Sequence, residues 1–181
     1  MYSTGDIKEI YSLTAVRVAL DKMADDLNRD HADKEFLALT LLNGAVVFAG
    51  NFVPLLTMPL RMDYAHATRY RNQLQGSTIQ LLAGPSETIA GCDILILDDI
   101  FDRGETLQWM RKYCLDNGAR SVCTAVLAMK NLQAEQRRPD VQMPDYCALT
   151  VPDEFVFGFG MDAGGRYRNL PGIYYLNSDE G

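Results

Sequence analysis

The sequence has few cysteines, few histidines and no excess of positive charge. It contains four cysteines, two histidines and a formal net charge of −7 at pH 7. The cysteines (Cys92, Cys114, Cys123 and Cys147) form no C-x-x-C pair and stand mostly in apolar stretches, which favours reduced, buried thiols over disulfides or a zinc site. The negative charge argues against non-specific binding to nucleic acid or anionic membranes, because the overall field repels polyanions.

Long hydrophobic runs and targeting signals are also missing. The start, MYSTGDIKEIY, lacks the basic region and apolar core of a secretory signal. No apolar run approaches the length that a bilayer requires. The hydrophobic fraction of 48% and charged fraction of 23% are those of an ordinary globular domain. We therefore expect a cytoplasmic protein with a single domain over residues 1–181.

Several catalytic motifs are absent as well. Without G-x-x-x-x-G-K-[ST], a nucleotide hydrolase of the P-loop type is disfavoured. The sequence has no G-x-S-x-G motif and no Cys beside a plausible His partner. It therefore gives no sign of a covalent acyl mechanism. The segment 158–163, G-F-G-M-D-A, fits G-x-G-x-x-A, but too little chain follows it for the helix, strand and acid of a dinucleotide-binding fold.

The apolar periodicity predicts an α/β domain. Spacings of three and four from Ile10 to Leu27 predict a helix that ends near Asn28. A second helix could start within 46–56, and a third follows Gly104 and stops at Asn117-Gly118. Apolar strands alternate with these helices, so we expect a parallel sheet flanked by helices. Strands or short apolar segments are expected at 36–42, 58–70, 77–82, 92–100, 121–129, 146–151, 155–159 and 170–176, with a polar loop at 69–78.

The segment ILILDDIFDRGETL at 94–107 carries the chemistry. Its apolar strand delivers Asp98 and Asp99 to the carboxyl end of a buried strand, where open α/β sheets bind ligands. The loop 102–106 leads straight into a helix, whose unpaired N–H groups and positive dipole end suit a phosphate. Gly104 allows close approach and Thr106 adds a hydroxyl, while the two acids suit a sugar diol or Mg²⁺. The acids could instead be plain surface residues, although the complete pattern argues against that.

This segment resembles the phosphoribosyl pyrophosphate signature of type I phosphoribosyltransferases. A second stretch, PDEFVFGFGMDAGGRYRNLPGIYYL at 152–176, resembles the C-terminal segment of the hypoxanthine-guanine branch of that family. The likeness spans about residues 36–176, and the N-terminal helix matches only in type. It implies a type I phosphoribosyltransferase fold with a small hood formed by the N-terminal segment and about 150–181.

The resemblance implies a transfer of phosphoribosyl from phosphoribosyl pyrophosphate to hypoxanthine or guanine, with Mg²⁺ as cofactor. By this likeness Asp98 and Asp99 face the ribose hydroxyls and the metal. Asp102 is the general base near the purine N7. The loop that cradles the 5′-phosphate comprises Asp102, Arg103, Gly104, Glu105 and Thr106.

The purine pocket is assigned by the same resemblance. Lys130 donates to the purine O6, Phe155 stacks on the base, and Val156 lies at the base edge. Asp162 lies near the base and is a third metal ligand. A cationic donor suits the O6 acceptor of hypoxanthine, guanine or xanthine and opposes the 6-amino group of adenine. The preference among the three 6-oxopurines is left open.

Three positions depart from the family pattern. LLNGA at 41–45 resembles the pyrophosphate loop, which usually has Lys-Gly where this chain has Asn43-Gly44; Arg168 is expected to help hold pyrophosphate. The mobile lid usually carries Ser-Tyr, where this chain has Arg69-Tyr70, and Arg103 stands where a small residue is common. Arg69 and Arg71 could supply phosphate contacts that are lost at Asn43.

These departures leave a second hypothesis open. The chain could be a non-catalytic regulator that senses phosphoribosyl pyrophosphate or a nucleotide with the same fold. The retained Asp102, Lys130, Phe155 and Asp162 favour the enzyme, because a sensor need not keep the residues that face the base. The expected partners are small-molecule substrates and further copies of the chain, in a homodimer or homotetramer.

Overall fold

A computed structural model describes residues 7–72, 76–132, 136 and 140–176. In its six-stranded main sheet the order is β4-β3-β2-β5-β6-β7. All neighbouring pairs are parallel except β3 and β4. The α/β prediction is therefore confirmed, with one antiparallel edge strand that makes the sheet mixed. The strands are β2 (Phe36–Leu41), β3 (Leu60–Asn72), β4 (Gly76–Ala83), β5 (Asp93–Phe101), β6 (Ser121–Lys130) and β7 (Tyr146–Val151).

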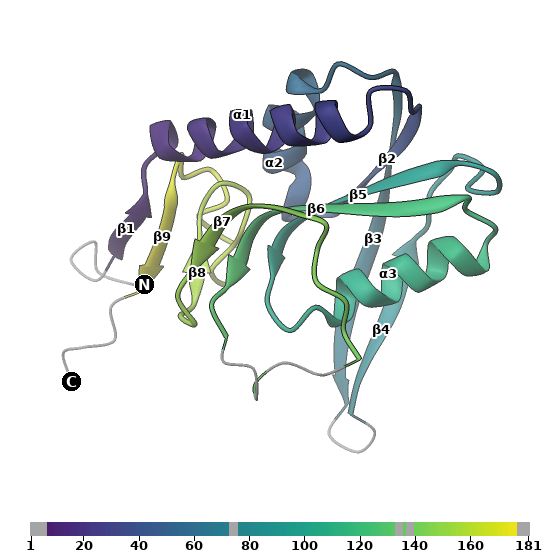
Figure 1. The fold of residues 1–181 in the computed structure, drawn as a ribbon. Coiled ribbons are helices and arrows are strands. Elements are labelled where there is room, and N and C mark those ends of the chain that lie inside the picture. The colour runs from purple at the N-terminus through teal and green to yellow at the C-terminus, as the bar shows by residue number, and fades with distance from the viewer. Residues whose placement is uncertain (1–6, 73–75, 133–135, 137–139, 177–181) are drawn as a thin grey trace.

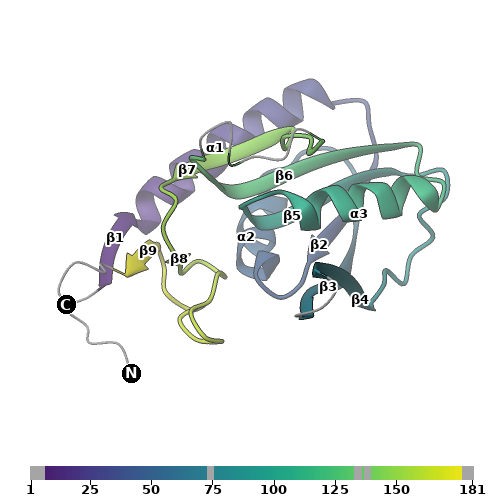
Figure 2. The same cartoon turned by 90° about the horizontal axis from the view of Figure 1, so that it is seen from below.

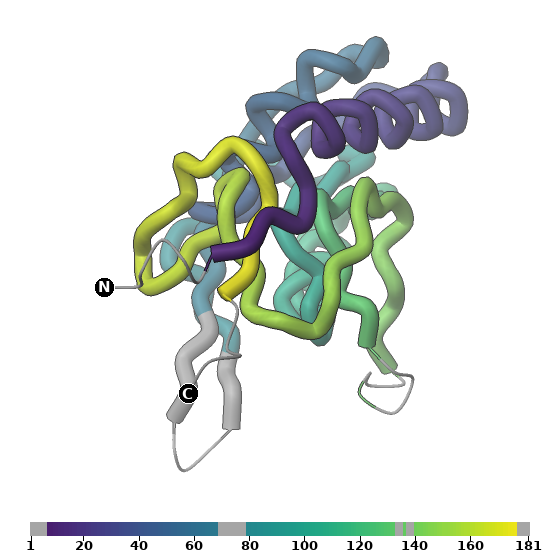
Figure 3. Tube along the Cα trace, turned by 90° about the vertical axis from the view of Figure 1, so that its left-hand side faces the viewer, coloured from purple at the N-terminus to yellow at the C-terminus, as the bar shows by residue number. Residues whose placement is uncertain are grey.

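The prediction of a loop over 69–78 is wrong for residues 69–72 and 76–78, and residues 73–75 lie outside the described residues. Strand β3 continues to Asn72 and β4 begins at Gly76, with Asn72 registered opposite Gly76. The two strands pair antiparallel, and their teal segments lie side by side in Figure 3. Main-chain hydrogen bonds between the strands hold a hairpin whatever its side chains are. The polar sequence of this segment has no hydrophobic face, so it gave no sign of the strand pairing.

Helices cover both faces of the main sheet. Helices α1 (Leu13–Asp30) and α2 (Ala45–Phe52) lie on one face, and α3 (Glu105–Asp116) lies on the other (Figures 1 and 2). The short 3-10 helix Val53–Leu55 follows α2. All three predicted helices are confirmed, but the boundaries of the first are corrected. Ile10 lies in a strand, and the helix starts after Ser12, whose side chain accepts from Ala15 N at 3.3 Å as an N-cap.

The core has two halves because β5 is buried on both faces. Leu95 and Leu97 pack into the cluster beneath α1 and α2, whereas Ile94 and Ile96 pack into the cluster beneath α3. This alternation explains why the strand reads as a continuous apolar run. The apolar run stops at Asp98, and the strand itself continues to Phe101.

Segments from the first and last described parts of the chain form a second, three-stranded sheet. Its order is β1-β9-β8, with antiparallel pairs, from β1 (Ile7–Tyr11), β8 (Val156–Phe157) and β9 (Ile173–Leu176). The Tyr11 hydroxyl ties it to the main sheet by donating to Thr150 O at 2.7 Å. Figure 1 shows this small sheet at the end toward which the arrowheads of β5 and β6 point.

The cysteines are free thiols, as the sequence predicts. Cys114 and Cys123 are buried, and Cys92 and Cys147 are half-buried. Burial raises the pKa of Cys114 to about 11 and that of Cys123 to about 12. These two thiols are therefore protonated core residues rather than nucleophiles. In the part of the chain that the structure describes, no helix has the length and apolarity to span a membrane.

Candidate active site

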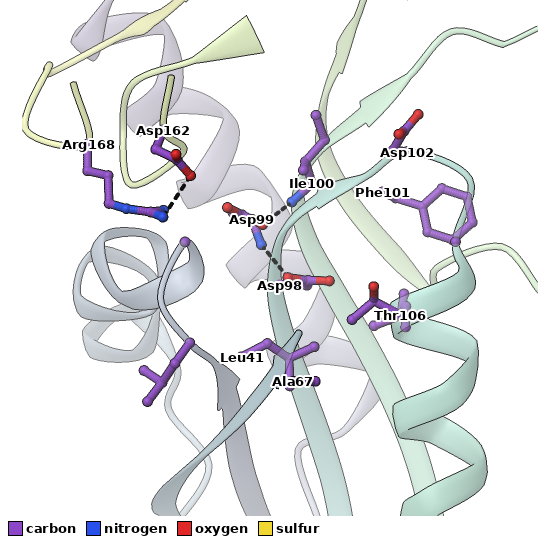
Figure 4. A pocket seen from close by; sticks show the side chains of 14 residues that line it. Leu41, Ala67, Asp98, Asp99, Ile100, Phe101, Asp102, Thr106, Asp162 and Arg168 are labelled. Carbon is purple, nitrogen blue, oxygen red and sulfur yellow. Dashed lines mark hydrogen bonds and ion pairs between the residues drawn. The ribbon is translucent and has the colours of Figure 1, made fainter. Parts of the chain in front are cut away.

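A pocket of about 270 Å³ opens at the carboxyl ends of β2 and β5. This is the edge where parallel sheets bind ligands. The N-terminus of α3 forms one wall, and the loop between β8 and β9 forms the opposite wall (Figure 4). The lining residues are Leu41, Leu42, Gly44, Ala67, Asp98, Asp99, Ile100, Phe101, Asp102, Gly104, Thr106, Leu107, Asp162 and Arg168.

Two adjacent acids stand in the middle of this pocket. Because side chains alternate along a strand, Asp98 points toward Thr106 and Asp99 points toward Asp162 and Arg168 (Figure 4). The backbone N–H of Asp99 donates to Asp98 Oδ1 at 3.0 Å, and that of Ile100 donates to Asp99 Oδ1 at 2.8 Å. Both carboxylates are thus fixed by the chain itself and serve opposite sides of the cavity.

The environment of Asp99 differs from that of an ordinary surface acid. Desolvation by burial raises the pKa of its carboxyl, and this outweighs the opposing effects of the hydrogen bond with the Asp98 side chain and of nearby Arg168. A carboxyl that loses water in this way gains from any cation or hydroxyl donor that enters the pocket.

The turn between β5 and α3 has the geometry that a phosphate requires. Gly104 has φ of +74°, and a Cβ there would overlap the Phe101 ring. The first helical hydrogen bond runs from Gln108 N to Gly104 O at 2.9 Å. The N–H groups of Thr106 and Leu107 precede this bond and lie at the end of the helix where anions bind.

Only part of the predicted phosphate loop reaches the cavity. Asp102, Gly104 and Thr106 line it. Arg103 is exposed and Glu105 is half-buried, and neither belongs to the lining. The loop thus contributes the acid Asp102, Gly104 and the hydroxyl residue Thr106 to the cavity.

The loop 41–45 packs closely against both Asp99 and Gly160. A Cβ at Gly44 would overlap the Asp99 carboxylate, and a Cβ at Gly160 would overlap the Gly44 carbonyl oxygen. Glycine is therefore required at both positions for steric reasons. Gly44 lines the pocket and Asn43 does not; Asn43 O accepts from Val46 N at 3.4 Å.

Asp162 and Arg168 form an ion pair on the opposite wall. Arg168 Nη2 lies 2.7 Å from Asp162 Oδ1, and Arg168 Nη1 donates to Gly160 O at 2.7 Å. Gly165 N donates to Asp162 Oδ2 at 2.7 Å. Charge-assisted bonds of this kind orient the guanidinium before a ligand arrives. The fixed cation faces the Asp99 side of the cavity (Figure 4).

Of the four residues assigned to the purine, Asp162 lines this cavity, and Lys130, Phe155 and Val156 are not among its lining residues. Lys130 ends β6, and its ammonium is 3.7 Å from Asp102 Oδ1. Phe155 is 57% exposed and Val156 is buried. Arg69 and Tyr70 lie in β3, but their side chains, like that of Arg71, fall outside the described part of the structure. The lid assignment stays a prediction.

Sequence reasoning missed the apolar part of the lining. Ile100 and Phe101 lay inside the quoted motif, and Leu41 and Leu42 beside Gly44, yet none was assigned to the site. Ala67 of β3 carried no signal at all, because its place depends on the pairing of β3 beside β2.

The described residues contain no group of three or more His, Cys, Asp or Glu placed to hold a metal. Asp98, Asp99 and Asp162 all line the pocket, and Asp162 already pairs with Arg168. The three-acid metal assignment stays a prediction.

Comparisons with known proteins agree on one family. The model of the phosphoribosyl transferase domain matches residues 6–163. A hypoxanthine-guanine phosphoribosyltransferase of Streptococcus thermophilus is 31% identical over 176 residues, covering 96% of each chain. That of Streptococcus pneumoniae is 31% identical over 177 residues, covering 97% of this chain and 96% of the relative.

Solved structures share the fold. A hypoxanthine phosphoribosyltransferase from Staphylococcus aureus superposes with a TM-score of 0.86 at 24% identity, covering 97% of this chain and 96% of its own. A hypoxanthine-guanine phosphoribosyltransferase from Bacillus anthracis with HEPES in its active site has a TM-score of 0.85 at 26% identity, covering 93% of this chain and 98% of its own.

Proposed function

The chain belongs to the phosphoribosyltransferase family, and we propose that it is a purine salvage enzyme that makes a nucleotide from a 6-oxopurine and phosphoribosyl pyrophosphate. One observation carries this proposal. The strand-end acids, the anion-binding start of α3 and the oriented Arg168 all line a single pocket. The substrate class follows from the relatives of 31% identity that match nearly the whole chain.

Each wall of the pocket has a task in this reaction. The first turn of α3, with Gly104 and Thr106, binds the 5′-phosphate. Asp98 and Asp99 accept from the ribose hydroxyls. Arg168 and the backbone of the loop at Gly44 hold the pyrophosphate, whose bond to ribose C1′ breaks as the purine nitrogen bonds to that carbon. Cationic charge builds on the ribose, much as in glycoside cleavage.

Asp102 takes the proton that the purine must lose. It follows β5 directly, lines the pocket and is 42% exposed, so a base that enters from the open side can reach it. We assign Lys130, beside Asp102, to the purine O6, and Phe155 and Val156 to the face and edge of the ring. The small sheet of β1, β9 and β8 is the proposed hood above this base site.

The donor chemistry of the pocket fits Mg²⁺. Asp98, Asp99 and Asp162 offer carboxylate oxygens, the hard ligands that this ion prefers, and Mg²⁺ usually takes one or two carboxylates together with substrate phosphates and water. When bound, the ion would neutralise charge on the leaving pyrophosphate. Arg168 stays next to Asp162 and contributes the protein's own cation there.

The cellular setting is part of the proposal. Free cysteines fit a reducing cytoplasm. The oligomer is proposed to be a homodimer or homotetramer. The regulator hypothesis was based on Asn43 and Arg69, which differ from the residues usual in the family. Neither the fold nor the relatives' names favour it.

A direct assay tests the function. The protein should convert hypoxanthine or guanine to its 5′-nucleotide when phosphoribosyl pyrophosphate and Mg²⁺ are supplied, because the anion site and the predicted O6 donor occur in one chain. Nucleotide formation is measured for hypoxanthine, guanine, xanthine and adenine. Binding of phosphoribosyl pyrophosphate without turnover of any 6-oxopurine would favour the regulator instead.

Ligand binding should stabilise the fold. At about 100 times its Kd, a ligand adds about 2.7 kcal/mol to the free energy of unfolding. For a chain of this size this corresponds to a rise in Tm of roughly 5–10 °C. We expect this rise with phosphoribosyl pyrophosphate and Mg²⁺, and a smaller one after addition of a chelator.

Ribose 5-phosphate is the matched ligand for that experiment. It keeps the 5′-phosphate and lacks the pyrophosphate, so its shift should not depend on Mg²⁺. If the chelator leaves the shift with phosphoribosyl pyrophosphate unchanged, Asp98, Asp99 and Asp162 hold no metal-linked substrate.

A further inference from the structure

Strand register places three charged residues in a row beside the pocket. Phe101 of β5 pairs with Met129 of β6, so Asp102 and Lys130, which follow them, are level with each other. Lys130 pairs in turn with Val151, the last residue of β7. Asp153 comes two residues later, after Pro152, whose ring restricts the backbone. Three neighbouring parallel strands thus end in an acid, a base and an acid.

The lysine in the middle contacts both acids. Its ammonium lies 3.4 Å from Asp153 Oδ1 and 3.7 Å from Asp102 Oδ1. The Lys130 side chain is only 17% exposed, against 44% for Asp153. Gln136 Nε2 donates to Asp153 Oδ2 at 3.3 Å, and Asn131 N donates to Val151 O at 2.8 Å. Gln136 therefore binds one carboxylate oxygen of Asp153, and the other oxygen faces Lys130.

This arrangement matters because the two acids compete for one cation. A Lys130 that paired with Asp102 alone would engage the proposed general base and turn its own donors away from the purine O6. A lysine side chain also has many rotamers, and a second carboxylate reduces the number that it samples. Asp153 supplies that second carboxylate on the side away from Asp102.

We propose that Asp153 is a positioning residue that holds the Lys130 ammonium off Asp102 and directs it to the O6 of a 6-oxopurine. The inference rests on the proposed function, in which Lys130 contacts O6. Under this inference, the selectivity for 6-oxopurines depends on Asp102, Lys130 and Asp153 together.

A purely structural ion pair would behave differently. Partly exposed pairs contribute about 0–1 kcal/mol to folding, whichever substrate is present. A positioning role affects the purine and spares the other substrate. The distinguishing measurements are therefore the KM values of the two substrates and the ratio of efficiencies for hypoxanthine and adenine.

The test compares Asp153→Asn with its matched control Glu154→Gln, the exposed acid next in the chain. Asp153→Asn should lower kcat/KM for hypoxanthine by about 5–10-fold. The KM for phosphoribosyl pyrophosphate and the Tm should stay unchanged. Asp153→Glu should recover most of the loss, and Glu154→Gln should behave as wild type. Equal losses for hypoxanthine and adenine, or a raised KM for phosphoribosyl pyrophosphate, would overturn the proposal.

A double-mutant cycle with Lys130→Gln shows whether Asp153 acts through the lysine. If it does, Asp153→Asn causes no further loss once Lys130 is replaced. Additive losses would overturn the inference. So would a Lys130→Gln variant that loses selectivity while Asp153→Asn does not, and in that case the proposed function stands. A wild-type protein that converts no 6-oxopurine would instead remove the proposed function, and the inference with it.

Discussion

Replacing Asp102 by Asn should lower the turnover of hypoxanthine by roughly 10²–10⁴-fold, the usual cost of losing a general base. The amide has nearly the same shape as the carboxylate, but it cannot take a proton from the purine. Asp102 lines the pocket between the ribose acids and the start of α3. Its place there favours proton transfer over a role in folding. Binding of phosphoribosyl pyrophosphate should therefore stay largely intact.

Two measurements separate these effects for Asp102→Asn. Steady-state rates give kcat for hypoxanthine, and the Tm shift with phosphoribosyl pyrophosphate and Mg²⁺ reports binding of the other substrate. Asp116→Asn is a matched control, because Asp116 pairs with Lys112 on the exposed surface of α3. Near-normal turnover by Asp102→Asn would show that the proton leaves by another route.

Replacing Lys130 by Gln should lower the efficiency for hypoxanthine by about 10–100-fold. A charge-assisted hydrogen bond to O6 contributes roughly 1.5–3 kcal/mol, which corresponds to that range. Adenine has no acceptor at position 6, so its efficiency should fall far less, and the glutamine oxygen can accept from its amino group. The half-buried side chain of Lys130 and its ion pairs with Asp102 and Asp153 place the ammonium next to the proposed base site.

The informative quantity is the ratio of efficiencies for hypoxanthine and adenine, in wild type and in Lys130→Gln. Lys112→Gln removes a lysine that is 73% exposed on α3 and should leave the ratio unchanged. If Lys130→Gln lowers both efficiencies equally, the lysine serves the ribose, the phosphate or the fold. The assignment of the purine pocket would then be wrong.

Local sequence patterns predicted much of this architecture. An apolar run followed by two acids identified β5 and its carboxyl end, and the glycine after it located the start of α3. These features depend on residues within one or two turns of each other, where alternation, helical spacing and turn chemistry act directly. The same segments carried the family resemblance. The start of α1 was misplaced because Ile10 continues the apolar spacing of the helix while it belongs to β1.

Other features arose only when distant segments met. The sequence proposed a pyrophosphate loop at Asn43-Gly44, but only the structure shows that a Cβ at position 44 would overlap the Asp99 carboxylate. Ala67 lines the pocket because β3 pairs with β2. Lys130 stands between Asp102 and Asp153 because three strands share one register. Each strand's own pattern sets which face its side chains take, but register depends on how the whole sheet packs. The sequence by itself therefore determined most of the elements and the chemistry of their ends, but not β1 or the pairing of β3 with β4, and the tertiary structure decided which of those ends meet.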